Sequence, residues 1–214
     1  MKPLHQNKRL ILLFIPILLL LSCAFVFWQA SAVFGARPGY LFGFLFYWLF
    51  WCIFIPVGLI GIKSIIQLFT YKNRMFNPGI ILCLFIPLIF VYAYAFPAAI
   101  RASNFTIVFL SLVISLVNAP LEEILWRGVY LKIFKEEKYK GILYSSVGLA
   151  VWHYAPQVIF SNPHPGGAHS FVIFAFFLGL AYAFAAWKQQ SLFWVTIAHV
   201  LFDFGGLGAR IYFI

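Results

Sequence analysis

The chain has 214 residues, of which 64% are hydrophobic and 9% are charged, and its formal net charge is +10. Soluble domains average about 45–50% apolar and about 25% charged residues, so this composition excludes a soluble globular domain. What remains is a membrane protein with several spans, because a bilayer core of roughly 30 Å needs about 20 apolar residues for each helical crossing. At this length, roughly six to eight crossings joined by short loops are expected.

The apolar runs of the sequence are separated by polar residues, glycines and prolines. Only helices and closed barrels satisfy their backbone hydrogen bonds in lipid, and these runs lack the alternation of period two that a strand shows. The sequence therefore predicts an all-α fold, a polytopic transmembrane bundle of about seven helices. The expected spans lie near residues 10–34, 40–62, 79–100, 103–127, 142–160, 170–187 and 191–213, the last interrupted by Gly205, Gly206 and Gly208.

The basic residues are distributed unevenly between the two sides of these spans. Cytoplasmic loops carry the excess of Lys and Arg, which places the N-terminus and the 132–140 loop in the cytoplasm and the C-terminus outside. The net charge is thereby explained by membrane topology, and no nucleic-acid partner is expected. The short length and the lack of an obvious retention signal favour a bacterial inner membrane. One side holds eleven cations, Lys2, Lys8, Arg9, Lys63, Lys72, Arg74, Lys132, Lys135, Lys138, Lys140 and Lys188, and the other holds three, Arg37, Arg101 and Arg210.

Three of the five acidic residues lie within or beside predicted spans. An ionisable side chain at membrane depth costs several kcal/mol and indicates a functional site. These residues are Glu122, Glu123 and Asp203, and two histidines, His153 and His199, also lie within spans. Counted from the nearest cytoplasmic cation at 1.5 Å per residue, Glu122, His153 and His199 lie roughly 15–20 Å deep. Because three helices carry polar groups to a similar depth, the sequence predicts one shared polar pocket.

Helical spacing predicts how some of these side chains pair. Glu123 and Arg127 stand at i, i+4 in the order that favours an ion pair. Glu122 is turned about 100° from Glu123, so it is expected to remain free for chemistry. His199 and Asp203 also stand at i, i+4 and share one helix face. A purely structural pair and satisfied core histidines are the alternative interpretation.

The polar residues form three motifs in a definite order. They are EExxxR from Glu122 to Arg127, an isolated His153, and HxxxD from His199 to Asp203. This order resembles the CAAX-protease and bacteriocin-processing family of intramembrane proteases, also called the Abi family, and is similar to its Rce1-type glutamic proteases. The resemblance implies one transmembrane domain, 1–214, in which 1–100 forms variable N-terminal helices and 103–204 forms the catalytic core.

The resemblance also implies a mechanism, in which a glutamate activates water to hydrolyse a peptide bond. Glu122 would act as general base on a water held between it and His153, and His199 would stabilise the oxyanion. Asp203 stands where the family often has Asn, so it would orient His199 or donate a hydrogen bond while protonated. No cofactor or metal is implied, and the partners would be the lipid bilayer and a peptide or membrane-protein substrate. The supporting residues would be Glu123, Arg127 and Asn118.

Other interpretations of the same residues stay open. Two histidines and a carboxylate can bind zinc, although the sequence has no HExxH. Glu and His within membranes also relay protons in transporters, although no repeated halves are seen here. A non-enzymatic bacteriocin-immunity or partner-binding protein would keep the same fold. A prenylated peptide, a bacteriocin leader and a C-terminal sorting tail all suit a protease that opens toward the cytoplasm or the lipid, and the oligomeric state is not determined.

Overall fold

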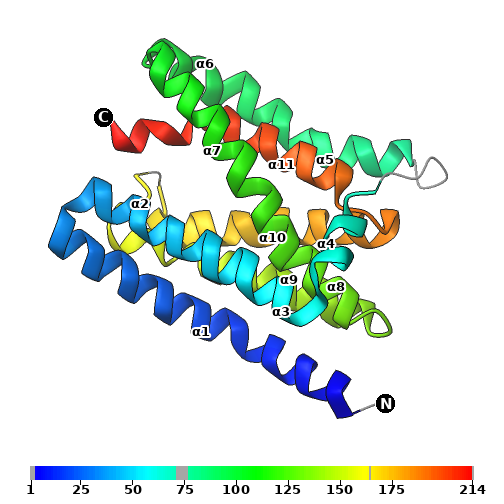
Figure 1. Ribbon diagram of the computed structural model, residues 1–214. Helices are drawn as coiled ribbons and strands as arrows, with labels where there is room; N and C mark the ends of the chain where they lie inside the picture. Colours follow the sequence, from blue (N-terminus) through cyan, green and yellow to red (C-terminus); the bar gives the residue numbers. More distant parts are fainter. Residues whose placement is uncertain (1–2, 71–76, 164, 214) are drawn as a thin grey trace.

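The computed structural model describes residues 3–70, 77–163 and 165–213. Helices joined by short turns make up these ranges, and they contain no strand, so the predicted all-α fold is confirmed. Figure 1 shows one bundle whose helices run between two ends, with the N-terminus at one end and the C-terminus at the other. Three cations used to predict the topology, Lys2, Lys72 and Arg74, lie outside the described residues.

Over the described ranges, consecutive helical elements that continue one another form seven long helical segments, called rods here. This number agrees with the number of predicted spans. Five rods are long and apolar enough to cross a membrane, whereas α9 and α11 are shorter, at 15 and 13 residues. The rods are α1 (Pro3–Phe34); α2 (Ala36–Phe46) with the π-helix η1 (Tyr47–Phe54) and α3 (Ile55–Ile60); α5 (Pro78–Phe90) with the π-helix η3 (Val91–Ala95) and α6 (Phe96–Arg101); α7 (Phe105–Glu123) with the π-helix η4 (Ile124–Val129) and α8 (Tyr130–Ile133); α9 (Lys138–Trp152); α10 (Gly167–Gln189); and α11 (Phe193–Gly205).

Three short elements modify the predicted spans. The α-helix expected over 142–160 ends at Trp152, because Pro156 has no N–H to donate to the carbonyl oxygen of Trp152. The chain continues as a turn and the 3₁₀-helix η5 (Pro156–Val158), so the predicted extent of this helix is wrong. The small helix α4 (Ile62–Leu68) was not predicted.

The interruption of the last span is confirmed, since α11 ends at Gly205 and the 3₁₀-helix η6 (Gly208–Tyr212) follows.

Helices α1 and α2 form a hairpin whose close packing depends on glycine. Gly35 joins them at φ 87°, a region that residues with a side chain rarely adopt. A Cβ atom at Gly39 would collide with the backbone of Ser31, and one at Gly43 would collide with the ring of Phe27. Small residues allow helix backbones to approach closely in membranes, and here they bring α2 against α1.

The two ends of the bundle differ in charge. One end, called here the lysine-rich end, contains the first residues of α1, the α8–α9 turn and the end of α10 (Figure 1). Arg9 Nη1 lies 3.5 Å from Glu137 Oε2, and Lys138 Nζ lies 4.7 Å from the centre of the Trp187 ring, so these segments are neighbours. The described members of the eleven-cation set are Lys8, Arg9, Lys63, Lys132, Lys135, Lys138, Lys140 and Lys188.

The opposite end, called here the C-terminal end, brings together segments far apart in the sequence. The ring of Tyr40, near the start of α2, lies 5.2 Å from that of Phe160 and 5.8 Å from that of Tyr212. The α1–α2 turn, the segment after α9 and the last residues of the chain therefore meet there (Figure 1).

Buried aromatic side chains fill the bundle between the site region and the lysine-rich end. Trp126 and Tyr130 on the η4–α8 segment are fully buried, and Phe134 is nearly so. Trp126 Nε1 donates to the hydroxyl of Tyr47 across 2.9 Å, and the Tyr130 hydroxyl donates to the Leu12 carbonyl across 2.9 Å. The first bond joins η4 to η1, and the second joins α8 to α1. We call Tyr47, Trp126, Tyr130 and Phe134 the aromatic plug.

Candidate active site

The two consecutive glutamates lie where helix α7 changes to the π-helix η4. Glu122 and Glu123 are the last two residues of α7, and Pro120 precedes them within the same helix. Single π-helical turns inside α-helices occur frequently at functional sites, because the wider turn redirects the side chains around it. Both carboxylates are buried, with exposed fractions of 2% for Glu122 and 0% for Glu123.

All four residues predicted to be catalytic line one small cavity. Its volume is about 60 Å³, and its walls include Glu122, His153, His199 and Asp203. A polar cavity needs roughly 10–15 Å³ to hold a water molecule, so this one has room for water with several polar partners. The predicted convergence of Glu122, His153 and His199 from three helices is therefore confirmed. Glu123 does not line this cavity, although its partner Arg127 does, in agreement with the prediction that Glu123 pairs with Arg127 instead of facing the water site.

The imidazole of His199 lies between the two glutamates. Its Nδ1 atom is 2.8 Å from Glu123 Oε1, and its Nε2 atom is 3.6 Å from Glu122 Oε2. Asp203 Oδ1 lies 3.5 Å from the same Nε2 atom. The sequence predicted that Asp203 would orient His199 or donate a hydrogen bond while protonated; in the structure the shortest contact of this ring is from Nδ1 to Glu123, which accepts the hydrogen bond. Nε2 is the nitrogen that faces Glu122 and Asp203.

Glu123 is held by a buried ion pair. Arg127 Nη1 lies 3.1 Å from Glu123 Oε1, and neither side chain is exposed. The guanidinium carbon of Arg127 also lies 5.7 Å from the centre of the Tyr182 ring, a cation–π contact. The predicted i, i+4 pair is confirmed, and the same carboxylate oxygen serves both Arg127 and His199.

Glu122 is oriented by a tryptophan from another helix. Trp152 Nε1 donates to Glu122 Oε1 across 2.9 Å, which leaves Oε2 directed toward His199. The Trp152 ring is itself fixed by stacking on Tyr47, with ring centres 3.5 Å apart. Because the last residue of α9 binds this carboxylate, Glu122 has a fixed direction within the cavity.

Asp203 belongs to a chain of hydrogen bonds that crosses three helices. Asn118 Nδ2 donates to Asp203 Oδ2 across 3.0 Å, and Trp48 Nε1 donates to Asn118 Oδ1 across 2.8 Å. The predicted supporting residue Asn118 therefore holds Asp203 in place. Asp203 still has its other oxygen, Oδ1, on the side of His199.

His153 lies at the end of α9 rather than within it, and its ring is held by local contacts. Its Nδ1 atom is 2.7 Å from the Leu149 carbonyl oxygen, and its ring packs edge-on against Phe171 at 5.1 Å. A carbonyl oxygen only accepts hydrogen bonds, so Nδ1 is the protonated nitrogen. The neutral ring then presents Nε2 as an acceptor. The contact from Leu149 is made by its backbone, so this bond does not depend on the side chain at position 149.

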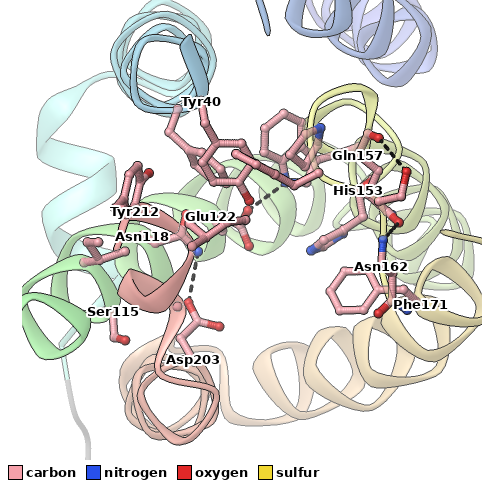
Figure 2. A pocket seen from close by; sticks show the side chains of 18 of the residues that line it. Tyr40, Ser115, Asn118, Glu122, His153, Gln157, Asn162, Phe171, Asp203 and Tyr212 are labelled. Carbon is pink, nitrogen blue, oxygen red and sulfur yellow. Dashed lines mark hydrogen bonds between the residues drawn. The ribbon is translucent and has the colours of Figure 1, made fainter. Parts of the chain in front are cut away.

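A larger cavity of about 360 Å³ leads away from these residues. Glu122, His153 and Asp203 belong to its wall, together with Tyr40, Gln157 and Tyr212. Figure 2 shows Glu122 and His153 on facing sides of this cavity, with Asp203 on α11 below them. Its remaining wall reaches the segment after α9 and the residues of η6, which lie at the C-terminal end. The lining therefore extends toward the C-terminal end, whereas the sequence analysis considered a protease that opens toward the cytoplasm or the lipid.

Sequence analysis missed the tryptophans that hold the site. Trp48 and Trp152 each donate an indole N–H to a predicted site residue, Asn118 and Glu122. Buried tryptophans usually donate their indole N–H to an acceptor. The position of Trp152 directly before His153 could therefore have indicated that it binds a residue of the site. Among the described residues, no three His, Cys, Asp or Glu side chains are arranged as ligands of one metal ion.

Fold and site together define a multi-pass membrane protein with glutamates, histidines and an aspartate around a water-sized cavity. Residues 104–205 match the family model of Rce1-like proteins, described as type II CAAX prenyl endopeptidases. The match contains all seven predicted site residues and confirms the resemblance seen in the motifs. Over these residues the chain is similar to Rce1-like proteins, which supports a membrane endopeptidase of the CAAX-protease type. No curated protein and no solved structure is detectably similar to the chain.

Proposed function

We propose that this protein hydrolyses peptide bonds at the membrane with a water molecule that Glu122 activates. The observation that carries the proposal is the cavity of about 60 Å³ shared by Glu122, His153, His199 and Asp203. In this proposal Glu122 is the general base, His153 supplies an acceptor nitrogen and His199 a donor group around one water molecule in the cavity. The family match supports the same class of reaction over residues 104–205.

In the proposed reaction, water donates one hydrogen bond to Glu122 Oε2 and the other to His153 Nε2. The water oxygen attacks the carbonyl carbon of the substrate while its proton passes to Glu122. The negative oxygen of the tetrahedral intermediate accepts a hydrogen bond from Nε2–H of His199. Glu122 then returns the proton to the leaving nitrogen as the carbon–nitrogen bond breaks, which yields a carboxylic acid, an amine and the original enzyme.

The test compares Glu122→Gln with the wild-type protein. Purified full-length protein is incubated with a peptide library, and products are identified by mass spectrometry. Glutamine has the size of glutamate but does not take up the proton, so we expect cleavage to fall by about 10²–10⁴-fold. Glu136→Gln, in an exposed turn, is the matched control and should cleave like the wild type. Equal cleavage by a folded Glu122→Gln protein would exclude the proposal.

We further propose that no metal takes part. The zinc alternative uses the same histidines and a carboxylate, so it is tested on the same products. A chelator should leave the cleavage rate unchanged, whereas loss that zinc restores would support the metal-dependent alternative. A wild-type protein that binds peptides without cleaving any would favour the non-enzymatic, partner-binding alternative.

We also propose a bacterial inner membrane as the location of this multi-pass protein and a peptide or membrane protein as its substrate. The apolar rods support membrane integration, and the charge difference between the two ends supports the topology. Fractionation of the expressing cells into inner and outer membranes tests the location directly.

A further inference from the structure

We infer that substrate enters the catalytic centre from the extracytoplasmic side of the membrane, as an uncharged polypeptide segment with large apolar side chains. The inference rests on the proposed function and adds the side of entry and the class of substrate. It depends on where the larger cavity opens, on what closes its other end, and on which end of the bundle faces the cytoplasm.

The cavity opens at the C-terminal end of the bundle. Its catalytic part is formed by Glu122, His153 and Asp203, and its outer part by Tyr40, Tyr212 and residues 156–163. Ser161 and Pro163 are exposed, which marks this segment as the rim of the cavity. Along α7 the lining extends from Glu122 back to Ile114 and Ser115, in the direction of the N-terminus of that helix. The described lining thus runs from the site to one end only.

The lysine-rich end is closed to the site. Beyond Glu123 on the same rod come Leu125, Trp126 and Arg127, each with an exposed fraction of 0%. The aromatic plug continues this seal, and none of its four residues lines the cavity. Gly148 lets α9 approach Trp126 so closely that a Cβ atom would overlap the ring. A substrate coming from the lysine-rich end would have to displace this packing.

Charge assigns the two ends to the two sides of the membrane. The lysine-rich end holds eight of the described cations counted for topology, and the opposite end holds Arg37, Arg101 and Arg210. Because cytoplasmic ends carry the excess of Lys and Arg, the lysine-rich end faces the cytoplasm. The mouth of the cavity therefore faces the extracytoplasmic side.

The wall of the cavity fits an apolar segment of polypeptide. Outside the catalytic residues, aromatic side chains are the most numerous group in the lining, and its polar members are neutral amides and hydroxyls such as Gln157, Asn162 and Ser161. Among the described lining residues, only the catalytic group carries ionisable acids or a histidine. A volume of about 360 Å³ lies in the range of small-ligand sites, roughly 300–1,000 Å³, and admits a short stretch of extended chain. Since this space is continuous with the wall that contains Glu122, the occupant is the substrate.

The first experiment measures access with cysteine variants and needs no substrate. Cys23 and Cys52 are buried, so only Cys83 is replaced, giving a Cys83→Ser parent protein. Single cysteines are then introduced at the rim (Ser161→Cys), within the cavity (Ile114→Cys, at a partly exposed position of its wall) and at the lysine-rich end (Lys135→Cys). Intact cells are treated with a small, membrane-impermeant methanethiosulfonate reagent, before or after permeabilisation, and modification is measured by mass spectrometry.

We expect the rim and cavity cysteines to be modified in intact cells, and the cysteine at position 135 only after permeabilisation. The parent protein measures the background from the two buried cysteines. The reverse pattern would overturn the assigned side, and a cysteine at position 114 that stays unmodified from both sides would overturn the open cavity. If Ile114→Cys does not fold, Gln157→Cys on the wall of the same cavity replaces it.

The second experiment separates this inference from the proposed function. A membrane-impermeant peptide with a central apolar stretch is offered to right-side-out and inside-out vesicles and to detergent-solubilised protein. We expect cleavage by right-side-out vesicles, and cleavage by inside-out vesicles only after detergent is added. Cleavage that is faster in sealed inside-out vesicles would overturn the inference. If no peptide is cleaved in detergent, the proposed function fails, whereas cysteine labelling still decides the side of access.

Discussion

The Nδ1 nitrogen of His199 lies 2.8 Å from Oε1 of Glu123, and this hydrogen bond determines which nitrogen of the imidazole carries the proton. Arg127 pairs with the same oxygen, so Glu123 is an acceptor and Nδ1 carries the proton. The Nε2 nitrogen is then a donor only when the ring is doubly protonated. In the proposed mechanism the imidazolium form of His199 stabilises the oxyanion, and Glu123 is a positioning residue.

We expect Glu123→Gln to lower kcat more than it changes KM. The amide removes the charge that holds both Arg127 and Nδ1 of His199, while its side chain keeps the same shape. Removal of one group that supports an oxyanion donor costs about 10²–10³-fold in kcat. Steady-state kinetics over a range of pH values measures the effect, because an altered pH profile distinguishes loss of His199 orientation from a general loss of fold. A variant with wild-type kcat and an unchanged profile would show that Glu123 has only a packing role.

The ion pair of Arg127 is expected to matter for stability. Arg127→Ala would leave the carboxylate of Glu123 buried without its partner, and breaking a buried pair costs about 3–5 kcal/mol. We therefore expect a lower Tm in detergent and a lower yield of folded protein. Arg101→Ala, at the end of α6, removes an exposed cation and is the control. If Arg127→Ala melts like the wild type, the pair contributes little to the fold.

Trp152→Phe tests how Glu122 is oriented. Phenylalanine keeps an aromatic ring against Tyr47 but loses the indole N–H that binds Glu122 Oε1. A hydrogen bond to a charged group contributes about 1.5–3 kcal/mol, so kcat/KM should fall roughly 10- to 100-fold. Trp126→Phe removes the corresponding bond to the Tyr47 hydroxyl, away from Glu122, and should reduce stability more than activity. Equal effects of the two variants on kcat/KM would contradict the assigned role.

Asp203→Asn is expected to retain activity with a changed pH profile. The carbonyl oxygen of an asparagine can still accept the hydrogen bond from Asn118, but the negative charge 3.5 Å from His199 Nε2 is lost. That loss changes the pH range over which His199 is protonated. Asp203→Ala also leaves Asn118 without its acceptor and should lose roughly 10²–10³-fold in rate. Cleavage rates measured against pH for both variants show whether the charge of Asp203 acts on His199. An unchanged pH profile in Asp203→Asn would exclude a role for ionised Asp203.

Much of the site was predictable because it rests on spacing within single helices. Glu123 and Arg127 pair as their i, i+4 spacing indicates, and the equal depth of Glu122, His153 and His199 indicated one cavity. The contacts between helices were not predictable in the same way. A membrane helix that is apolar on all sides has no polar face, so the sequence does not say how it is rotated. The indole bonds of Trp48 and Trp152 depend on that rotation.

By itself, the sequence determined that this protein is an all-α membrane bundle of about seven helices, because long apolar runs are stable in lipid only as helices. It also determined the order of the acidic and histidine motifs and the charge difference between the two ends. Only the tertiary structure decided that His199 lies between Glu122 and Glu123 and that the cavity opens at the C-terminal end. Both features depend on side-chain packing between helices distant in the chain, where aromatic residues close one end and leave the other open.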